Sequence, residues 1–213
     1  LQIIVTREEK YILDNSSPLS DALVWLERET NLRTSHARML TGAVQGRFLE
    51  LVACLLKPHR ILEIGTFTGY SAICLAKGLD EGGILDAVEK NDELATLIEE
   101  AIQRANLSDK IMLHYGDALE IIPKLNNSYE LVYIDANKRE YTRYFDLIID
   151  KIPSGGIILA DNVLWDGKVY QDNVPNDTQT QEILKFNIKV REDSRVENFI
   201  LPLRDGINII RKL

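Results

Sequence analysis

From Arg60 onward, short apolar runs alternate with longer amphipathic stretches. The short runs fit buried strands, and the stretches between them fit helices. This alternation is typical of βαβ units, so we expect a mostly parallel sheet with helices on both faces. The expected strands cover 61–64, 84–88, 111–114, 131–134 and 156–160, and the expected helices cover 70–77, 92–104, 118–122 and 140–149.

The amino-terminal quarter lacks this alternation. The pattern of residues 1–57 predicts helices, which would form an amino-terminal cap on the α/β core. Ser20 or Asp21 could begin a helix over 22–28, and residues 42–56 carry apolar side chains at helical spacing.

The carboxyl-terminal part predicts a hairpin. A helix is expected over 178–190, followed by strand-like runs at 196–203 and 207–213. The Arg-Asp-Gly sequence of 204–206 between them is typical of a hairpin turn. A parallel sheet that ends in a hairpin contains one antiparallel strand at or near its edge.

Length and composition limit the classes of function. A chain of 213 residues suits a single α/β domain over 1–213, with 1–57 as the cap and 58–213 as the core. The net charge of −8 argues against nucleic acid as a partner. We find no apolar run near the roughly 20 residues of a membrane span. Cys54 and Cys74 lie in apolar segments, so we expect buried thiols and a cytoplasmic location.

A glycine turn follows the first predicted strand. Ligands of parallel α/β sheets bind at the carboxyl ends of the strands. Gly65 and Gly69 could let the backbone approach such a ligand, although a plain tight turn is the alternative. Phe67 stands where a dinucleotide fingerprint has its second glycine, which disfavours NAD.

Acidic residues end the next two predicted strands. Glu89 could accept hydrogen bonds from both ribose hydroxyls, or be a solvated carboxylate. Asp117 could cap the following helix, contact an adenine, or do both. Together with the glycine turn, these positions outline an adenosine site that requires no phosphate.

Hard oxygen ligands follow the fourth and fifth predicted strands. Asp135 ends the fourth strand, and Asp161 with Asn162 ends the fifth. Each alone is also a common cap or turn residue. Neighbouring parallel strands bring them to one rim, where two carboxylates and an amide suit Mg²⁺, with Mn²⁺ or Ca²⁺ as alternatives, better than structural zinc.

A lysine lies close to this expected metal site. Lys138 is three residues past Asp135. A neighbouring cation favours the neutral form of a lysine, which could then act as a general base. The alternative is a solvated side chain. His36, His59 and His114 are scattered and are expected to form no site.

These residues resemble the cation-dependent O-methyltransferases, which include caffeoyl-CoA O-methyltransferases, their bacterial relatives and, more distantly, catechol O-methyltransferase. The resemblance spans nearly the whole chain in order: 39–41 with 45–46, 63–71, 116–118, 135–138, 161–167, 201–203 and 205–206. The Asp-Asn-Val-Leu-Trp sequence of 161–165 is the most specific segment.

The resemblance implies a Rossmann-like class I methyltransferase fold with a seven-stranded, mostly parallel sheet, a homodimer and the methyl donor S-adenosylmethionine. The positions that would contact this cofactor are Met39, Thr41, Glu63, Gly65, Thr66, Ser71, Glu89, Asp117, Ala118, Asp135 and Asn137. Asp135, Asp161 and Asn162 would hold the metal. Lys138, Trp165 and Asp166 would lie beside the acceptor, with Lys138 and Asp135 catalytic.

The sequence departs from the family at four places. Asn137 stands where plant members more often have Asp, and Arg204 where Gly is common. The segment 170–179 and the amino terminus, which help plant members to select the acceptor, show no clear match.

The expected activity is methylation of one of two adjacent hydroxyls on a small aromatic acceptor. Both hydroxyl oxygens would bind the metal, Lys138 or solvent would take the proton, and the oxygen would attack the sulfonium methyl in line. S-adenosylhomocysteine would be the product. The alternatives are a nucleotide-dependent oxidoreductase, disfavoured by Phe67, and a non-catalytic adenosyl-ligand-binding protein on the same scaffold.

Overall fold

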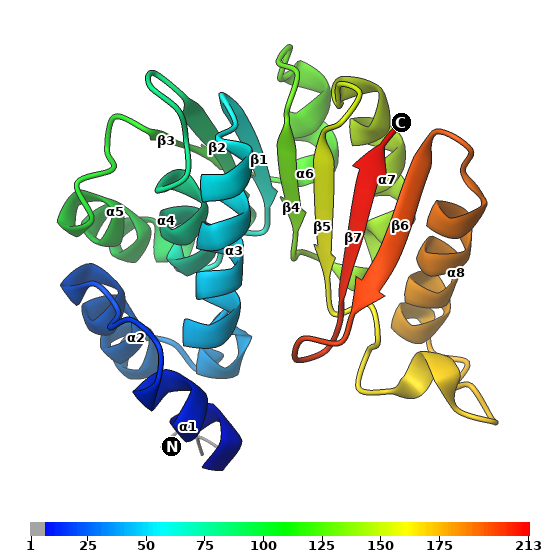
Figure 1. Ribbon diagram of the computed structural model, residues 1–213, viewed down its shortest axis with the longest axis horizontal. Helices are drawn as coiled ribbons and strands as arrows, with labels where there is room; N and C mark the ends of the chain where they lie inside the picture. The colour runs from blue at the N-terminus through cyan, green and yellow to red at the C-terminus, as the bar shows by residue number, and fades with distance from the viewer. Residues whose placement is uncertain (1–6) are drawn as a thin grey trace.

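The computed structural model describes residues 7–213. Their strands form one seven-stranded sheet in the order β3-β2-β1-β4-β5-β7-β6 (Figure 1). β7 is antiparallel to both β5 and β6, and the other neighbouring strands are parallel. The strands are β1 (Arg60–Ile64), β2 (Ile84–Glu89), β3 (Ile111–Tyr115), β4 (Leu131–Ile134), β5 (Ile157–Asp161), β6 (Val196–Leu201) and β7 (Ile207–Lys212). The predicted α/β class, the hairpin and its reversed strand are therefore confirmed.

Helices cover both faces of the sheet. They are α1 (Arg7–Asp14), α2 (Asp21–Arg33), α3 (Ala43–Leu56), α4 (Tyr70–Ala76), α5 (Ala95–Arg104), α6 (Ala118–Ile121), α7 (Tyr141–Ile148) and α8 (Thr178–Glu192). Short 3₁₀ turns adjoin several of them: η1 (Ala37–Met39), η2 (Asp92–Leu94), η3 (Ile122–Lys124), η4 (Lys138–Glu140), η5 (Ile149–Lys151) and η6 (Lys168–Tyr170). The helical prediction for residues 1–6 lies outside the described part of the chain.

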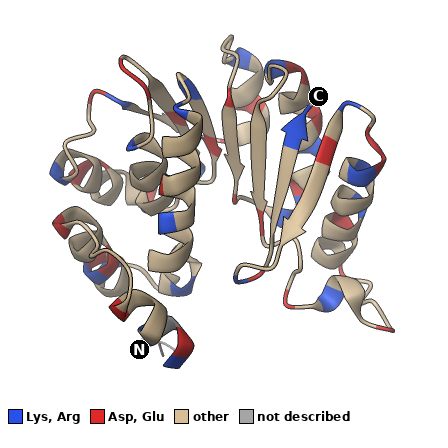
Figure 2. Ribbon diagram, in the orientation of Figure 1, with Lys and Arg blue, Asp and Glu red and all other residues tan. Residues whose placement is uncertain are grey.

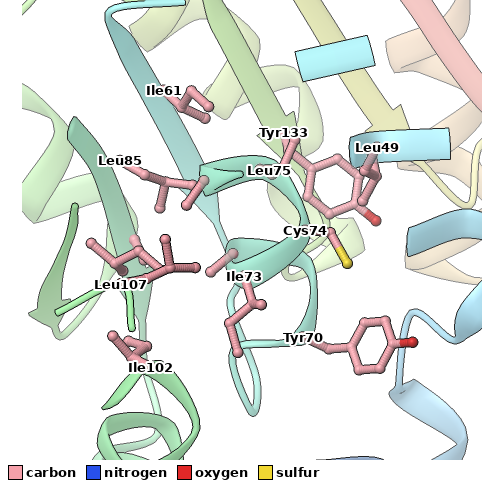
Figure 3. Packing of buried hydrophobic residues seen from close by; sticks show 14 of the residues in the cluster. Leu49, Ile61, Tyr70, Ile73, Cys74, Leu75, Leu85, Ile102, Leu107 and Tyr133 are labelled. Carbon is pink, nitrogen blue, oxygen red and sulfur yellow. The ribbon is translucent and has the colours of Figure 1, made fainter. Parts of the chain in front are cut away.

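Two hydrophobic clusters, one on each face, hold these layers together. The first cluster joins α2, α3, α4 and α5 to the sheet, and the second joins α6, α7 and α8 to it. Figure 3 shows Leu49 of α3, Cys74 of α4 and Tyr133 of β4 within the first cluster. The central strands β1, β2, β4 and β5 are almost continuously buried, as expected for strands covered on both faces.

The apolar segment around α3 differs from the sequence-based expectation. The stretch Ala37–Leu56 is 20 residues long and apolar enough for a membrane span, which we had not expected. The structure divides it into η1 and the 14-residue helix α3. One helix of this kind is weak evidence for a span, since core helices pass the same test. α3 buries Leu49 and Ala53 against the sheet layer.

The same helix corrects the prediction for one cysteine. Cys74 is buried, and burial raises the pKa of its thiol to about 12. Cys54 is exposed, because it lies one position past the buried Ala53 and so points away from the buried side of α3. Both thiols are free, as expected. Ser20 precedes α2 at the N-cap position but makes no capping hydrogen bond through its side chain.

Candidate active site

Backbone hydrogen bonds join the carboxyl ends of the central strands into one rim. Ile64 at the end of β1 lies opposite Val88 and Ile134 in the strand register. The amide of Gly65 donates to Val88 at 2.9 Å, and the amide of Asp135 donates to Ile64 at 2.9 Å. The residues that follow β1, β2 and β4 are therefore fixed relative to one another.

Gly65 allows the turn after β1 to touch the turn after β4. Its φ is +90°, which favours glycine. A Cβ atom at this position would lie 2.4 Å from the backbone oxygen of Asp135. Glycine is therefore required here for the two turns to approach so closely.

Glu63 places a buried carboxylate beneath this turn. Its Oε2 accepts a hydrogen bond from the Thr66 hydroxyl. Burial raises the pKa of Glu63 to about 8. Its Oε1 is buried and has no hydrogen-bond partner among the described residues. A ligand donor or a cation is therefore the group that would satisfy this oxygen.

Glu89 at the end of β2 connects two turns of the rim. Its Oε2 accepts from the amide of Phe67 at 2.7 Å, and its Oε1 accepts from the amide of Asn91 at 2.8 Å. Phe67 has a φ of +51°, so the glycine turn is held in an uncommon conformation against this carboxylate. Each carboxylate oxygen has a second lone pair for a ligand hydroxyl.

The remaining expected cofactor residues differ in exposure. Asp117 caps α6 by accepting from the amide of Leu119 at 2.9 Å, so its capping role is confirmed. It also pairs with Lys90 at 2.8 Å. Thr41, Ser71 and Ala118 are buried, whereas Met39 and Asn137 are exposed.

Asp161 at the end of β5 is almost fully buried and held by three donors. Its Oδ2 accepts from Nε2 of Gln45 at 2.6 Å and from the hydroxyl of Tyr133 at 3.0 Å. Its Oδ1 accepts from the amide of Asn162 at 2.7 Å. Burial, together with the nearby charge of Asp135, raises the pKa of Asp161 to about 6. Two acids thus compete for ionisation at this part of the rim.

Lys138 lies beside the other acid of this pair. Its Nζ is 2.7 Å from Oδ1 of Asp135 and 2.8 Å from the hydroxyl of Tyr141. That hydroxyl also contacts the carbonyl of Asp161 at 2.9 Å. Burial holds the pKa of Tyr141 well above its usual range, so the hydroxyl keeps its proton. Tyr141 thus links the Lys138–Asp135 ion pair to the backbone of Asp161.

The loop after β5 adopts strained conformations at the same rim. Asn162, Trp165 and Asp166 have φ values of +59°, +48° and +52°. Non-glycine residues with positive φ are uncommon and cluster at functional sites. The amide of Asp166 donates to Oδ1 of Asp205 at 2.7 Å, which ties this loop to the β6–β7 turn.

The expected metal ligands form a mixed set of carboxylate and amide oxygens. No group of three or more His, Cys, Asp or Glu side chains in residues 7–213 is arranged to hold a metal ion. The expected set instead combines the carboxylates of Asp135 and Asp161 with the amide of Asn162. Lys138 provides one positive charge near these two acids, and Asp205 adds a third acid beside Asn162. This excess of negative charge and the oxygen donors fit a divalent cation.

The sequence-based prediction assigned no function to four residues of this region: Gln45, Tyr133, Tyr141 and Asp205. Positions 45 and 205 lie in segments that carry the family resemblance. The position of Gln45 could have been predicted from the helical spacing. Leu49 and Ala53 follow it by one and two helical turns, so this polar residue lies on the apolar, buried side of the helix. Tyr133 lies inside a fully buried strand, where its sequence position gives no hint of a hydrogen-bonding role.

Arg204 links the β6–β7 turn to the segment before α3. Its guanidinium donates to the carbonyls of Leu40 and Thr41. Its φ is +50°, which explains why glycine would suit this position. The departure from the family pattern therefore adds a contact beside Thr41.

Similarity to known proteins agrees with the fold. A protein-family model described as O-methyltransferase matches residues 13–213. Caffeoyl-CoA O-methyltransferase 2 of Petunia hybrida is 32% identical over 219 residues, covering 96% of this chain and 89% of that protein. Caffeoyl-CoA O-methyltransferase 1 of Nicotiana tabacum is 32% identical over 200 residues, covering 87% and 82%.

Two solved structures are similar over almost the whole chain. The O-methyltransferase TomG from Streptomyces achromogenes, in complex with SAM, has a TM-score of 0.91 and 27% identity, covering 98% of this chain and 96% of that one. The O-methyltransferase from Bacillus cereus, in complex with SAH, has a TM-score of 0.89 and 29% identity, covering 98% of both. The sheet and its carboxyl-end rim define a methyltransferase of the α/β class. The chain belongs to the O-methyltransferase family and is an enzyme of that type.

Proposed function

We propose that this enzyme transfers a methyl group from S-adenosylmethionine to one of two adjacent hydroxyls of a small catechol-like or phenylpropanoid-like aromatic acceptor, with a divalent cation. The observation that carries this proposal is the pair of acids, Asp135 and Asp161, beside Lys138 at the same rim as the glycine turn. A positively charged methyl donor and a divalent cation both suit a rim rich in carboxylates.

The cofactor half of the proposal depends on the strand ends of β1, β2 and β3. The similar structures named above were solved with SAM or SAH. The unpartnered Oε1 of Glu63 suits the ammonium group of the cofactor, and Glu89 suits its ribose hydroxyls. We assign the other contacts to Met39, Thr41, Gly65, Thr66, Ser71, Asp117, Ala118, Asp135 and Asn137.

We assign the cation to Asp135, Asp161 and Asn162, with Mg²⁺ as the expected ion. A divalent cation bound there would make an acceptor hydroxyl more acidic and hold two adjacent oxygens in one orientation. A cation held by Asp135 would disfavour the charged form of the neighbouring Lys138. The amine would then take the proton of the attacking hydroxyl. The oxygen then forms a bond to the methyl carbon, and the electron pair of the breaking carbon–sulfur bond stays on sulfur.

The acceptor would lie against the strained loop after β5. Trp165 offers an aromatic face, and Lys168 lies 5.5 Å from the centre of its ring. Nε1 of Trp165 is buried without a partner among the described residues, so an acceptor oxygen could satisfy it. Asp166 lies next to it and could accept from a second polar group of the acceptor.

The deciding experiment is methyl transfer from labelled S-adenosylmethionine to a panel of catechols that includes caffeate. It is run with Mg²⁺, with EDTA and with single-hydroxyl analogues as matched controls. Transfer to vicinal diols alone, abolished by EDTA and restored by Mg²⁺, supports the proposal. Transfer that persists in EDTA contradicts the role of the cation, and transfer to single-hydroxyl analogues contradicts the acceptor class.

The alternative is a protein that binds an adenosyl ligand without catalysis. Binding of SAH without transfer to any acceptor would favour it.

We further propose a single domain over residues 1–213, a homodimer and a cytoplasmic location. The single domain is supported by the first hydrophobic cluster, which α2 and α3 share with the sheet. Basic and acidic residues are interspersed along the ribbon in Figure 2, which fits a small-molecule acceptor better than nucleic acid.

A further inference from the structure

Gln45 is a buried polar residue on the apolar side of α3. Only 1% of its surface is exposed, and Leu49 and Ala53 on the same side of the helix are fully buried. Gly46 brings the helix close to α4, since a Cβ there would lie 2.7 Å from the ring of Tyr70. The close packing of α3 on α4 therefore directs Gln45 toward the rim of the sheet.

Gln45, Tyr133 and Asp161 form a closed ring of hydrogen bonds. Nε2 of Gln45 donates to Oδ2 of Asp161 at 2.6 Å and to the hydroxyl of Tyr133 at 2.9 Å. The hydroxyl of Tyr133 has one hydrogen, which it donates to the same Oδ2 at 3.0 Å. A rotated amide would turn the Gln45 oxygen toward the carboxylate, so the acceptor-only carboxylate fixes the amide orientation.

This ring makes the two oxygens of Asp161 unequal. Both lone pairs of Oδ2 are used by Gln45 and Tyr133. Oδ1 accepts only the amide of Asn162 and keeps one lone pair. The carboxylate is therefore prevented from rotating and has one oxygen available for a cation.

We propose that Gln45, together with Tyr133, is a positioning residue that fixes the Asp161 carboxylate so that Oδ1 binds the divalent cation. This inference rests on the cation of the proposed function. Hydrogen-bond partners of metal ligands orient those ligands, and their loss typically weakens metal affinity by about 10–100-fold. The amino-terminal helices would then contribute to metal binding without supplying a ligand.

The test measures Mn²⁺ affinity by electron paramagnetic resonance and SAH affinity by calorimetry in EDTA. The variants are Gln45→Met, which keeps the length of the side chain without its donors, and Tyr133→Phe. Tyr129→Phe is the matched control, because the hydroxyl of Tyr129 also donates to a buried carboxylate, that of Asp86, at 3.1 Å. Asp86 lies within β2, away from its carboxyl end.

We expect Gln45→Met and Tyr133→Phe to raise the Kd for Mn²⁺ at least about 10-fold, with unchanged SAH affinity and with turnover restored at saturating Mn²⁺. Tyr129→Phe should leave both affinities unchanged. Unchanged Mn²⁺ affinity in the folded variants would overturn this inference and leave the proposed function standing. Equal weakening of Mn²⁺ and SAH binding would also overturn it, because that result indicates a general packing role.

Absence of Mn²⁺ binding by the unsubstituted protein would overturn the cation of the proposed function and this inference with it. If Gln45→Met does not fold, Tyr133→Phe decides the question, since it removes a single hydroxyl. The two failures are thereby distinguishable.

Discussion

The ammonium group of Lys138 lies 2.7 Å from Oδ1 of Asp135, and both side chains are largely screened from solvent. The lysine thus occupies the position beside Asp135 that a cation would share. The ammonium group of Lys138 and a bound cation would therefore compete for the carboxylate of Asp135. Because Lys138 is the proposed proton acceptor and Asp135 a proposed metal ligand, the two roles depend on each other.

Replacement of this lysine should separate catalysis from metal binding. Lys138→Met should lower turnover by about 10²–10⁴-fold, because the general base is lost. Its affinity for Mn²⁺ should be unchanged or higher, because Asp135 loses its competing cation. Lys189→Met is the control, since Lys189 of α8 pairs with Asp146 of α7 at 2.7 Å, away from the rim. A variant with weaker Mn²⁺ binding would contradict the competition.

Removal of a proposed metal ligand should have the opposite effect on metal binding. Asp161→Ala should abolish transfer and Mn²⁺ binding while SAH binding remains largely intact. Asp161→Asn, which keeps the shape of the side chain, should give the same result if charge is what the cation requires. Calorimetry and the labelled-methyl assay measure both effects. Turnover retained by Asp161→Ala would eliminate the metal role of this residue.

Glu89 should matter for the cofactor and not for the metal. Glu89→Gln replaces an ionised acceptor of hydroxyl hydrogen bonds, which contributes about 1.5–3 kcal/mol per bond, so the Kd for SAH should rise about 10–100-fold. Mn²⁺ affinity should not change. Asp92→Asn, three residues further along and exposed, is the control and should bind SAH normally. Equal affinities of the two variants would exclude a ribose contact at Glu89.

The buried acid Glu63 should make stability depend on pH. Burial raises the pKa of Glu63 from 4.5 to about 8, so the folded state holds more protons than the unfolded chain between these values. The stability linked to this proton is complete below pH 4.5 and is lost as the pH rises through 8. The free energy of unfolding, measured by urea titration without ligands, should therefore fall across this range by a few kcal/mol more than in Glu63→Gln.

The control for this pH series is Glu93→Gln, which changes an exposed carboxylate. Its curve of stability against pH should follow that of the unsubstituted protein. If Glu63→Gln gave a parallel curve as well, the raised pKa would be refuted.

The close contact between α3 and Gly78, which follows α4, should make stability sensitive to a side chain at position 78. A Cβ on Gly78 would lie 2.3 Å from the backbone carbon of Ala53. Gly78→Ala should lower the free energy of unfolding by about 1–3 kcal/mol, the usual range for overpacked cores. Lys77→Ala removes a partly exposed ion pair with Glu50 and should cost about 1 kcal/mol or less. Equal losses in chemical denaturation would show that α3 can shift at little cost.

The sheet could be predicted from sequence because each strand is a local pattern. A buried parallel strand needs several consecutive apolar residues, and β4 was predicted with its observed bounds for this reason. The strand ends then indicated where Asp135 and Asp161 would lie. Exposure on α3 was not predictable in this way, because an apolar residue such as Leu55 or Cys54 can face either direction.

The hydrogen-bond partners of the site were beyond such patterns. Gln45 and Asp161 are 116 positions apart, and their contact depends on how closely α3 packs on α4. Lys138 and Asp135 are three positions apart, so their contact followed from local geometry. Local spacing thus predicts neighbours along the chain, whereas contacts between layers depend on tertiary packing.

The contact between Gly65 and the backbone of Asp135 has a consequence for how this enzyme can evolve. Gly65 belongs to the proposed cofactor half of the rim and Asp135 to the proposed metal half, so the spacing between donor and acceptor depends on a backbone contact. Acceptor preference can change through the loop after β5 without altering that spacing. Position 65 itself has no such latitude, and among natural variants that retain methyl transfer we expect only glycine there.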